Sequence, residues 1–307
     1  MNRSLVSRLL VVLLLCMGAA PAWAGNGEAL LKYVPSSTRL IVNVNTATLR
    51  TTRGYAIALN AFKGTPKYNA TIKKLGFPDL NAFDTVMLTN IDANENDPQL
   101  FVAMEGRFDR KKMESEFALQ KEIKKEVIDG VTCWVVGDRE AATFANDTTL
   151  LVGAKATLVA SVKGAAAATG APGSRITALA SSISRVDRTQ EIWFVASVST
   201  RLQNRRAELK TFRSMRGTFD IGSGLALSAV ATLDSAASAT AKAADLTKQF
   251  SDGAASKEMA AMGLSSIYQS MKATAAGSDV TLTASYPQAQ WENLLRTATA
   301  VMAEELR

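Results

Sequence analysis

The order of short β-rich runs and helix-like segments limits this chain to a mixed α and β fold. In the first half, β-rich runs cover 39–45, 84–91 and 99–105, and helical patterns cover 47–62, 66–75 and 110–121. Asp109 stands where an N-cap is expected for the helix over 110–121. Met113 and Phe117 lie one turn apart on the face of that helix that we predict to be buried.

The clearest local signal is Asp129-Gly130, which lies between the apolar-rich runs 123–128 and 131–136. Asp-Gly favours the type I′ turn, whose twist matches that of paired strands. We therefore predict a hairpin here. A second hairpin is expected over 141–152, with Asn146-Asp147 as its turn, and a helix near 155–163 follows.

The same order returns after a small, turn-rich stretch at 164–173. A strand at 191–198 precedes a helix predicted over 201–215, and strands follow at 218–221 and 225–233. Asp234 is the predicted cap of a helix over 235–251, and a hairpin over 266–286 precedes a last helix over 288–306. We predict an α+β fold of two diverged β-α-β-β-α-β-β-α type units, with an antiparallel sheet and helices packed on it. The first unit spans 25–164, the linker 165–174 and the second unit 175–307, and the two units either share one continuous sheet or form separate layers.

Residues 1–24 have the three parts of an export signal: a basic start, the apolar run Leu9–Leu15, and the small-x-small site Ala22-Trp23-Ala24. We expect cleavage after Ala24 and a periplasmic or secreted mature protein. A membrane anchor is the alternative, but the apolar run is short for a bilayer of about 30 Å. Lipidation at Cys16 is not expected, because Leu15 stands where a small residue would precede a lipidated cysteine. No other segment has the length and hydropathy of a transmembrane helix.

The composition excludes several chemistries. The chain has no histidine, which rules out histidine-based triads and histidine-ligated zinc. The mature chain keeps one cysteine, Cys133, so it forms no internal disulfide, and the apolar residues around Cys133 indicate a buried thiol. The net charge of +7 is spread along the chain and does not indicate a nucleic-acid partner. We expect no cofactor and no enzymatic activity.

Two motifs in the sequence are candidate sites. Asp92-x-Asn94-x-Asn96 begins like a calcium loop, but Asp97 and Ala103 occupy the positions that need glycine and a carboxylate, so we expect no metal there. The second motif is a run of cations at near-helical spacing, which we interpret either as a face that binds an anion or partner, or as an ordinary solvated surface. This run consists of Arg201, Arg205, Arg206, Lys210, Arg213 and Arg216.

The chain resembles a group of exported bacterial two-repeat proteins of unknown function. The resemblance covers mainly residues 30–165 and rests on Tyr33-Val-Pro-Ser-Ser-Thr38, Gly106-Arg-Phe-Asp109 and Asp129-Gly130. These motifs are turns and caps. The resemblance implies a secreted α+β protein with two repeats, and it carries no catalytic residue with it.

From these features we expect an exported, non-enzymatic interaction protein of the cell envelope or the surrounding medium. Its partner would be an acidic protein or an anionic envelope component. The alternative is a module that binds a small molecule or an anionic ligand at a site between the two units, because such sites often form where domains meet. A cleft lined by aromatic residues would favour the alternative.

Overall fold

The computed structural model describes residues 27–63, 65, 80–91, 99–171, 173–222, 224–261 and 264–305. The first half of the chain forms α2 (Glu28–Leu31), β1 (Thr38–Val44), α3 (Thr46–Leu49), α4 (Arg53–Lys63), β2 (Phe83–Ile91), β3 (Gln99–Gly106), α6 (Arg110–Ala118), β4 (Ile123–Ile128), β5 (Val131–Val136), β6 (Glu140–Asn146), β7 (Thr149–Ala154) and α7 (Lys155–Ala166). The second half forms α8 (Ala180–Ile183), β8 (Ile192–Ser197), α9 (Thr200–Arg205), β9 (Phe212–Asp220), β10 (Gly224–Leu233), α10 (Ala236–Ala255), α11 (Lys257–Ala261), α12 (Ser265–Ser270), β11 (Lys272–Ala276), β12 (Asp279–Pro287) and α13 (Gln288–Glu305). Short 3₁₀ turns cover Leu80–Ala82 and Ala207–Leu209.

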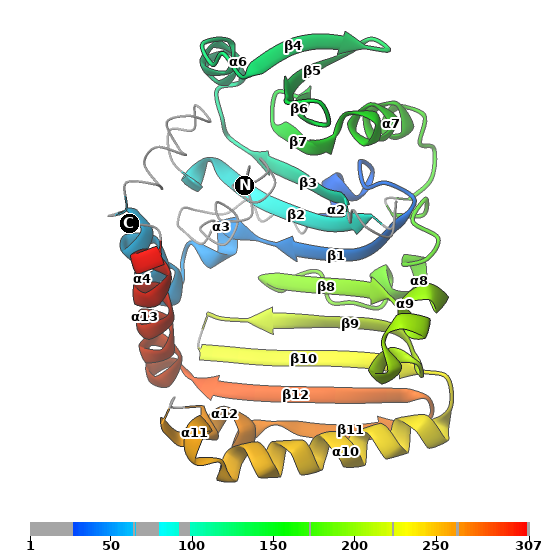
Figure 1. Cartoon of the computed structure of the whole chain (residues 1–307), viewed down its shortest axis with the longest axis vertical. Helices are drawn as coiled ribbons and strands as arrows, with labels where there is room; N and C mark the ends of the chain where they lie inside the picture. Colours follow the sequence, from blue (N-terminus) through cyan, green and yellow to red (C-terminus); the bar gives the residue numbers. More distant parts are fainter. Residues whose placement is uncertain are drawn as a thin grey trace.

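The strands that the structure describes belong to one 12-stranded sheet, in the order β11-β12-β10-β9-β8-β1-β2-β3-β7-β6-β5-β4 (Figure 1). Every neighbouring pair is antiparallel. The two halves of the chain meet where β1 pairs with β8, with Val42 opposite Phe194. Of the two arrangements left open by the sequence, the structure therefore has the continuous sheet.

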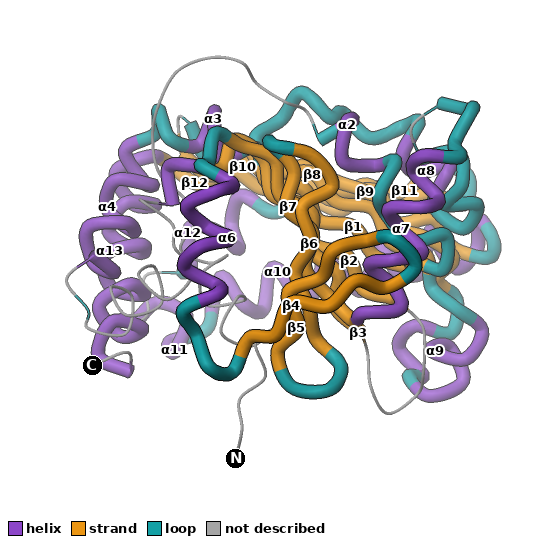
Figure 2. The backbone as a smooth tube through the Cα atoms, turned by 90° about the horizontal axis from the view of Figure 1, so that it is seen from above, coloured by secondary structure: helices purple, strands orange, loops and turns teal. Residues whose placement is uncertain are grey.

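Helices pack on both faces of this sheet. On one face, Leu49 of α3, Tyr55 of α4 and Met113 of α6 form a core with β2, β3 and β7. On the other face, α2, α7 and α8 cover a second core that includes Ile41 and Trp193. A third, smaller core forms where α10 lies over the ends of β9, β10 and β12. Helices α4 and α13 lie together at one end of the strands (Figure 2).

The predicted turn at Asp129-Gly130 and the predicted cap at Asp109 are confirmed. Asp129 and Gly130 join β4 to β5 with φ angles of 51° and 81°, as a type I′ turn requires. The Asp109 carboxylate accepts a hydrogen bond from the Lys112 amide at 3.0 Å and caps α6, and Met113 and Phe117 are buried. These features depend on neighbouring residues only, so the sequence contains the information for them.

Several predicted boundaries are wrong. The helix expected over 47–62 is two helices, α3 and α4, which are separated at residues 50–52. The cap of α10 is Ser235, which accepts the Ser238 amide, and not Asp234. The segment expected to begin a hairpin at 266 is the helix α12, and β11 begins only at Lys272. The helix expected over 66–75 lies outside the described residues, as does the predicted export signal, 1–24.

Candidate functional site

One face of the sheet presents apolar side chains across the join between the two halves. Residues directly opposite each other on paired strands point to the same face, so the register defines which side chains share it. We call this surface the apolar hollow. It consists of Leu40, Val42 and Val44 on β1, Ile192, Phe194 and Ala196 on β8, Met215, Gly217 and Phe219 on β9, Leu225, Leu227, Ala229 and Ala231 on β10, and Val280, Leu282, Ala284 and Tyr286 on β12.

The other face of β9, β10 and β12 is mostly polar, although Ala226 and Val230 of β10 also lie on it. Ser214, Arg216 and Thr218 alternate with the hollow residues of β9, and Ser228, Thr283 and Ser285 do so on the next strands. Antiparallel strands usually alternate in this way when their apolar side is covered and their polar side is solvated. The apolar hollow is therefore the side for which a cover is expected.

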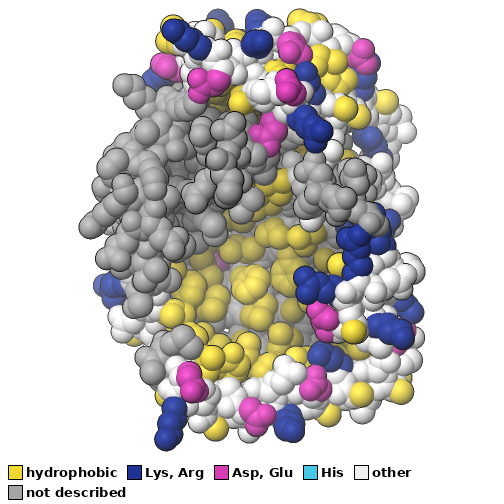
Figure 3. All heavy atoms as spheres, viewed as in Figure 1, with side chains coloured by type: hydrophobic (Ala, Val, Ile, Leu, Met, Phe, Trp, Pro, Cys, Tyr) yellow, Lys and Arg dark blue, Asp and Glu magenta, His cyan; other side chains and the backbone are white. Residues whose placement is uncertain are grey.

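The described helices cover the two ends of the hollow. Val280 packs with α10 in the third core, and Leu225 packs against the first core near α13. Between them, Val42, Phe194, Phe219, Leu227 and Leu282 are half-buried and belong to none of the cores formed by the described residues. Figure 3 shows this middle part as a concave apolar surface with charged side chains at its rim.

Aromatic side chains line the middle of the hollow. The rings of Phe194 and Phe219 lie 5.9 Å apart between centroids. Phe194 also lies over Gly217, where an added Cβ would come within 2.7 Å of the ring and 2.6 Å of the Ser228 carbonyl oxygen. Glycine at position 217 therefore leaves room for the Phe194 ring against the backbone of β9.

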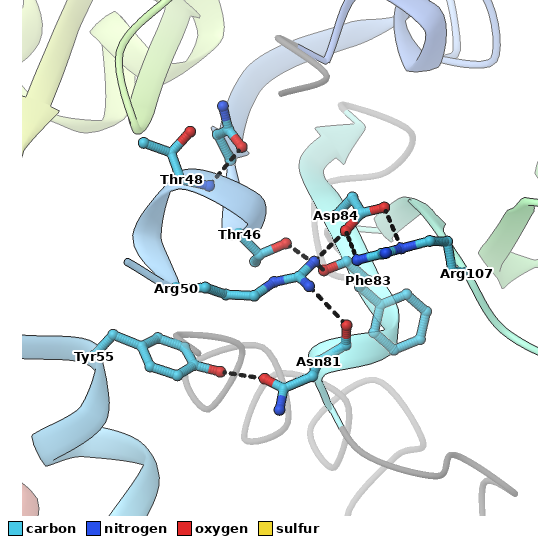
Figure 4. A network of polar contacts seen from close by, with 9 residues as sticks. Thr46, Thr48, Arg50, Tyr55, Asn81, Phe83, Asp84 and Arg107 are labelled. Atoms are coloured by element: carbon cyan, nitrogen blue, oxygen red, sulfur yellow. Dashed lines mark hydrogen bonds and ion pairs between the residues drawn. The ribbon is translucent and has the colours of Figure 1, made fainter. Parts of the chain in front are cut away.

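A buried polar network supports the wall of the first core (Figure 4). The Arg50 side chain, 1% exposed, donates hydrogen bonds to the Asn81 carbonyl at 2.9 Å and to the Phe83 carbonyl at 2.5 Å, and it pairs with Asp84. Arg107 approaches the other carboxylate oxygen of Asp84 at 3.4 Å. These contacts join Arg50, directly after α3, and Arg107, directly after β3, to residues 81–84 at the beginning of β2. We therefore interpret the network as structural.

A second polar cluster fixes the turn between β9 and β10. The Glu191 carboxylate accepts the Ile221 amide at 2.5 Å. Burial raises the pKa of Glu191; hydrogen bonds from the backbone amides of Ile221 and Gly222 oppose this shift, and the nearby Asp220 carboxylate adds to it. Two carboxylates that share a site in this way hold a proton more tightly than either would alone.

The predicted cationic run does not form one helical face. Helix α9 ends at Arg205, Lys210 follows a 3₁₀ turn, and Arg213 lies on β9 with an exposed side chain. Arg206 pairs with Glu208 at 3.7 Å. The helix expected over 201–215 is wrong from residue 206 onward because Phe212–Asp220 pairs with strands on both sides, β8 and β10. The assignment of Arg201, Arg205, Arg206, Lys210 and Arg213 to partner binding stays a prediction.

The remaining sequence candidates are structural or lie outside the described residues. Cys133 is a buried free thiol, and burial raises its pKa. Trp134 and Trp193 are buried in the cores. The stretch with the calcium-like pattern, 92–98, is outside the described residues. In the part of the chain that the structure describes, no group of three or more cysteine, aspartate and glutamate side chains could hold a metal ion.

The residues of the hollow were not predicted as a site. The alternation in 225–233 and 280–286 is a signal that each strand has one apolar and one polar face. It does not say which part of the apolar face the helices leave uncovered.

None of the described helices is long and apolar enough to cross a membrane.

Comparison with known proteins shows a fold relationship. No protein-family profile and no curated protein matches the chain. Crystal form III of TP0453, a Treponema protein of unknown function, matches with a TM-score of 0.51 at 7% identity, over 87% of this chain and 97% of that chain. Crystal form I of the same protein gives a TM-score of 0.49 at 9% identity, over 87% and 96%. The first match supports the α+β fold and says nothing of the site.

Proposed function

We propose that this chain is an exported, non-enzymatic binding protein and that the apolar hollow is its binding surface. The observation that carries this proposal is the half-buried apolar middle of the sheet, which no described helix covers. The export signal predicted from the sequence of residues 1–24 supports a periplasmic or secreted location. The absence of histidine from the sequence supports a role in binding over catalysis.

The occupant proposed is a small molecule with an extended apolar body. Apart from Tyr286, the side chains of the hollow have no polar group, and none of them is charged. A charged rim is also found around protein interfaces, so the rim does not distinguish the two kinds of site. The concave shape, with Phe194 and Phe219 in its lining, favours a ligand site, because ligand sites are concave and mostly apolar or aromatic.

The hollow also meets the condition stated for the sequence-based alternative, a site between the two units. Val42 belongs to the first half of the chain, and Phe194, Phe219 and Leu227 belong to the second. A ligand on this surface would contact both halves. The interaction that we first expected, with an acidic protein or an anionic envelope component, stays a separate prediction for the cationic run.

The test is binding of N-phenyl-1-naphthylamine, a neutral fluorescent probe, to the mature protein and to two variants of adjacent residues. Leu227→Glu places a charge in the middle of the hollow, and Ser228→Glu places the same charge on the opposite face of the same strand. Leu227→Phe, which narrows the hollow without a charge, serves as a second variant. Circular dichroism establishes that each protein is folded.

We expect saturable binding by the wild type and by Ser228→Glu, at least tenfold weaker binding by Leu227→Glu, and reduced binding by Leu227→Phe. A charge moved into an apolar site loses its hydration, which accounts for the direction and for roughly this size of effect. The proposal fails if the wild type shows no saturable binding, or if folded Leu227→Glu binds the probe as well as Ser228→Glu does. Retention of a protein partner that blocks the probe would indicate a protein-binding surface instead.

A further inference from the structure

A cavity lies on the opposite side of the molecule from the apolar hollow. It has a volume of about 300 Å³ and lies between the loop Pro35–Ser37 and helix α7, with Arg175 at its wall. Helix α7 packs on the core that contains Ile41 and Trp193, which is on the other face of the sheet. The inference below therefore does not depend on the proposed function.

Two polar groups in the wall of this cavity lack a hydrogen-bond partner. The Nη1 atom of Arg175 and the Oγ atom of Ser161 are both buried, and neither has a hydrogen-bond partner among the residues that the structure describes. Ser161 is only 3% exposed. Buried polar groups are nearly always paired, and an unpaired charged donor is the costliest kind. A guanidinium and a hydroxyl that both line one cavity are the donors that an oxyanion requires.

Gly164 holds the guanidinium in this position. A Cβ added at residue 164 would lie 2.1 Å from Nη2 and 2.5 Å from Nη1 of Arg175. Only glycine lets the guanidinium lie against the backbone of α7 at this point. Glycine within a helix costs about 0.5–1 kcal/mol relative to alanine, so the helix tolerates a destabilising residue where Arg175 rests.

The beginning of α7 adds to the positive potential of the cavity. Ala156 and Thr157, in the first turn, line the cavity, and the N-cap residue Ala154 makes no side-chain hydrogen bond to the helix. The first N–H groups of a helix have no intrahelical acceptor and attract anions. The exposed hydroxyl groups of Ser36 and Ser37 border the same space.

We infer that this cavity is a binding site for a small molecule that carries an oxyanion, either a carboxylate or a phosphate group. Arg175 supplies the charge, Ser161 and the first turn of α7 supply further donors, and Pro35 and Ala160 supply apolar contacts for the body of the molecule. The volume is sufficient for a small metabolite and too small for a folded partner.

The test is isothermal titration of the full mature protein with inorganic phosphate and, separately, with acetate, at constant ionic strength. Arg175→Gln removes the charge and keeps a polar side chain. Gly164→Ala displaces the guanidinium and favours the helix, so a loss of binding in this variant does not come from unfolding. Arg185→Gln is the matched control, because Arg185 is exposed and its guanidinium bonds only to Ser181 among the described residues.

We expect saturable binding of at least one anion by the wild type and by Arg185→Gln, and about tenfold or greater weakening in Arg175→Gln and Gly164→Ala. The stronger of the two probes identifies the group as phosphate or carboxylate. The inference is overturned if neither anion binds the wild type saturably, or if Arg175→Gln binds both anions as the wild type does.

Discussion

Replacement of Arg50 by methionine tests how much the buried hydrogen bonds and ion pair of Arg50 contribute to the free energy of unfolding. Arg50 is fully buried and reaches two backbone carbonyls and the Asp84 carboxylate (Figure 4). Methionine fills part of the space but leaves these acceptors without their donor. Removal of one partner from a buried ion pair costs about 3–5 kcal/mol. Because Asp84 is 21% exposed and keeps Arg107 as a partner, we expect the lower end, about 3 kcal/mol.

Urea and thermal unfolding, followed by circular dichroism, measure this cost. A loss of 3 kcal/mol corresponds to a fall in Tm of about 6–12 °C for a chain of this size. Arg107→Met is the control, because Arg107 is 61% exposed and its ion pair is worth less than about 1 kcal/mol. The reasoning is refuted if Arg50→Met is as stable as the wild type within about 1 kcal/mol, or if Arg107→Met costs as much as Arg50→Met does.

Two further predictions concern titratable groups. Because the pKa of Glu191 is raised in the folded state, its contribution to stability is present below its unfolded pKa and is lost as the pH rises through its folded pKa. The free energy of unfolding of the wild type minus that of Glu191→Gln, measured in urea, should therefore be larger near about pH 4 than near about pH 7. A difference that does not depend on pH would contradict this. Burial raises the pKa of Cys133. Its thiol should therefore react with a disulfide reagent at least about a hundredfold more slowly in the native protein than in urea. Equal rates would show that the thiol is accessible in the native protein.

The turns and caps were predictable because each depends on adjacent residues. Asp129-Gly130 and Asp109 have the expected conformations and bonds. The class of fold followed from the same local patterns, since alternating strands and capped helices leave few architectures. That β1 would pair with β8 was not predictable, because strand pairing between the halves depends on contacts far apart in sequence.

Tertiary pairing also overrode one local pattern. The cations from Arg201 to Arg216 recur at helical spacing, yet Phe212–Asp220 forms a strand between β8 and β10. Phe212 packs in the third core, so Arg213, the next residue on the strand, points away from this core. The helical spacing of the cations therefore does not place them on one face of the structure. The two-unit repeat stays a prediction, although in both halves the last strand pairs with the third strand.

The two candidate sites were hidden for different reasons. The alternation of apolar and polar residues in β10 and β12 predicts that these strands have an apolar face. How much of that face the helices leave uncovered depends on where α10 and α13 end. The anion cavity brings Ser37, Ser161 and Arg175 together from separate segments, and no sequence motif joins them. Which part of a sheet the helices cover, and which distant residues meet at a cavity, are properties of the assembled fold. They could therefore not be predicted from the single sequence.

The most direct test of the proposed function is the identity of what the protein carries when it is purified from its own cells. The mature wild type and Leu227→Glu are isolated in parallel and extracted with organic solvent, and the extracts are compared by mass spectrometry. The account predicts one or more small apolar molecules in near-stoichiometric amount with the wild type and their loss from folded Leu227→Glu. Extracts from the two proteins that are equally empty, or that hold the same molecules in equal amount, would contradict it.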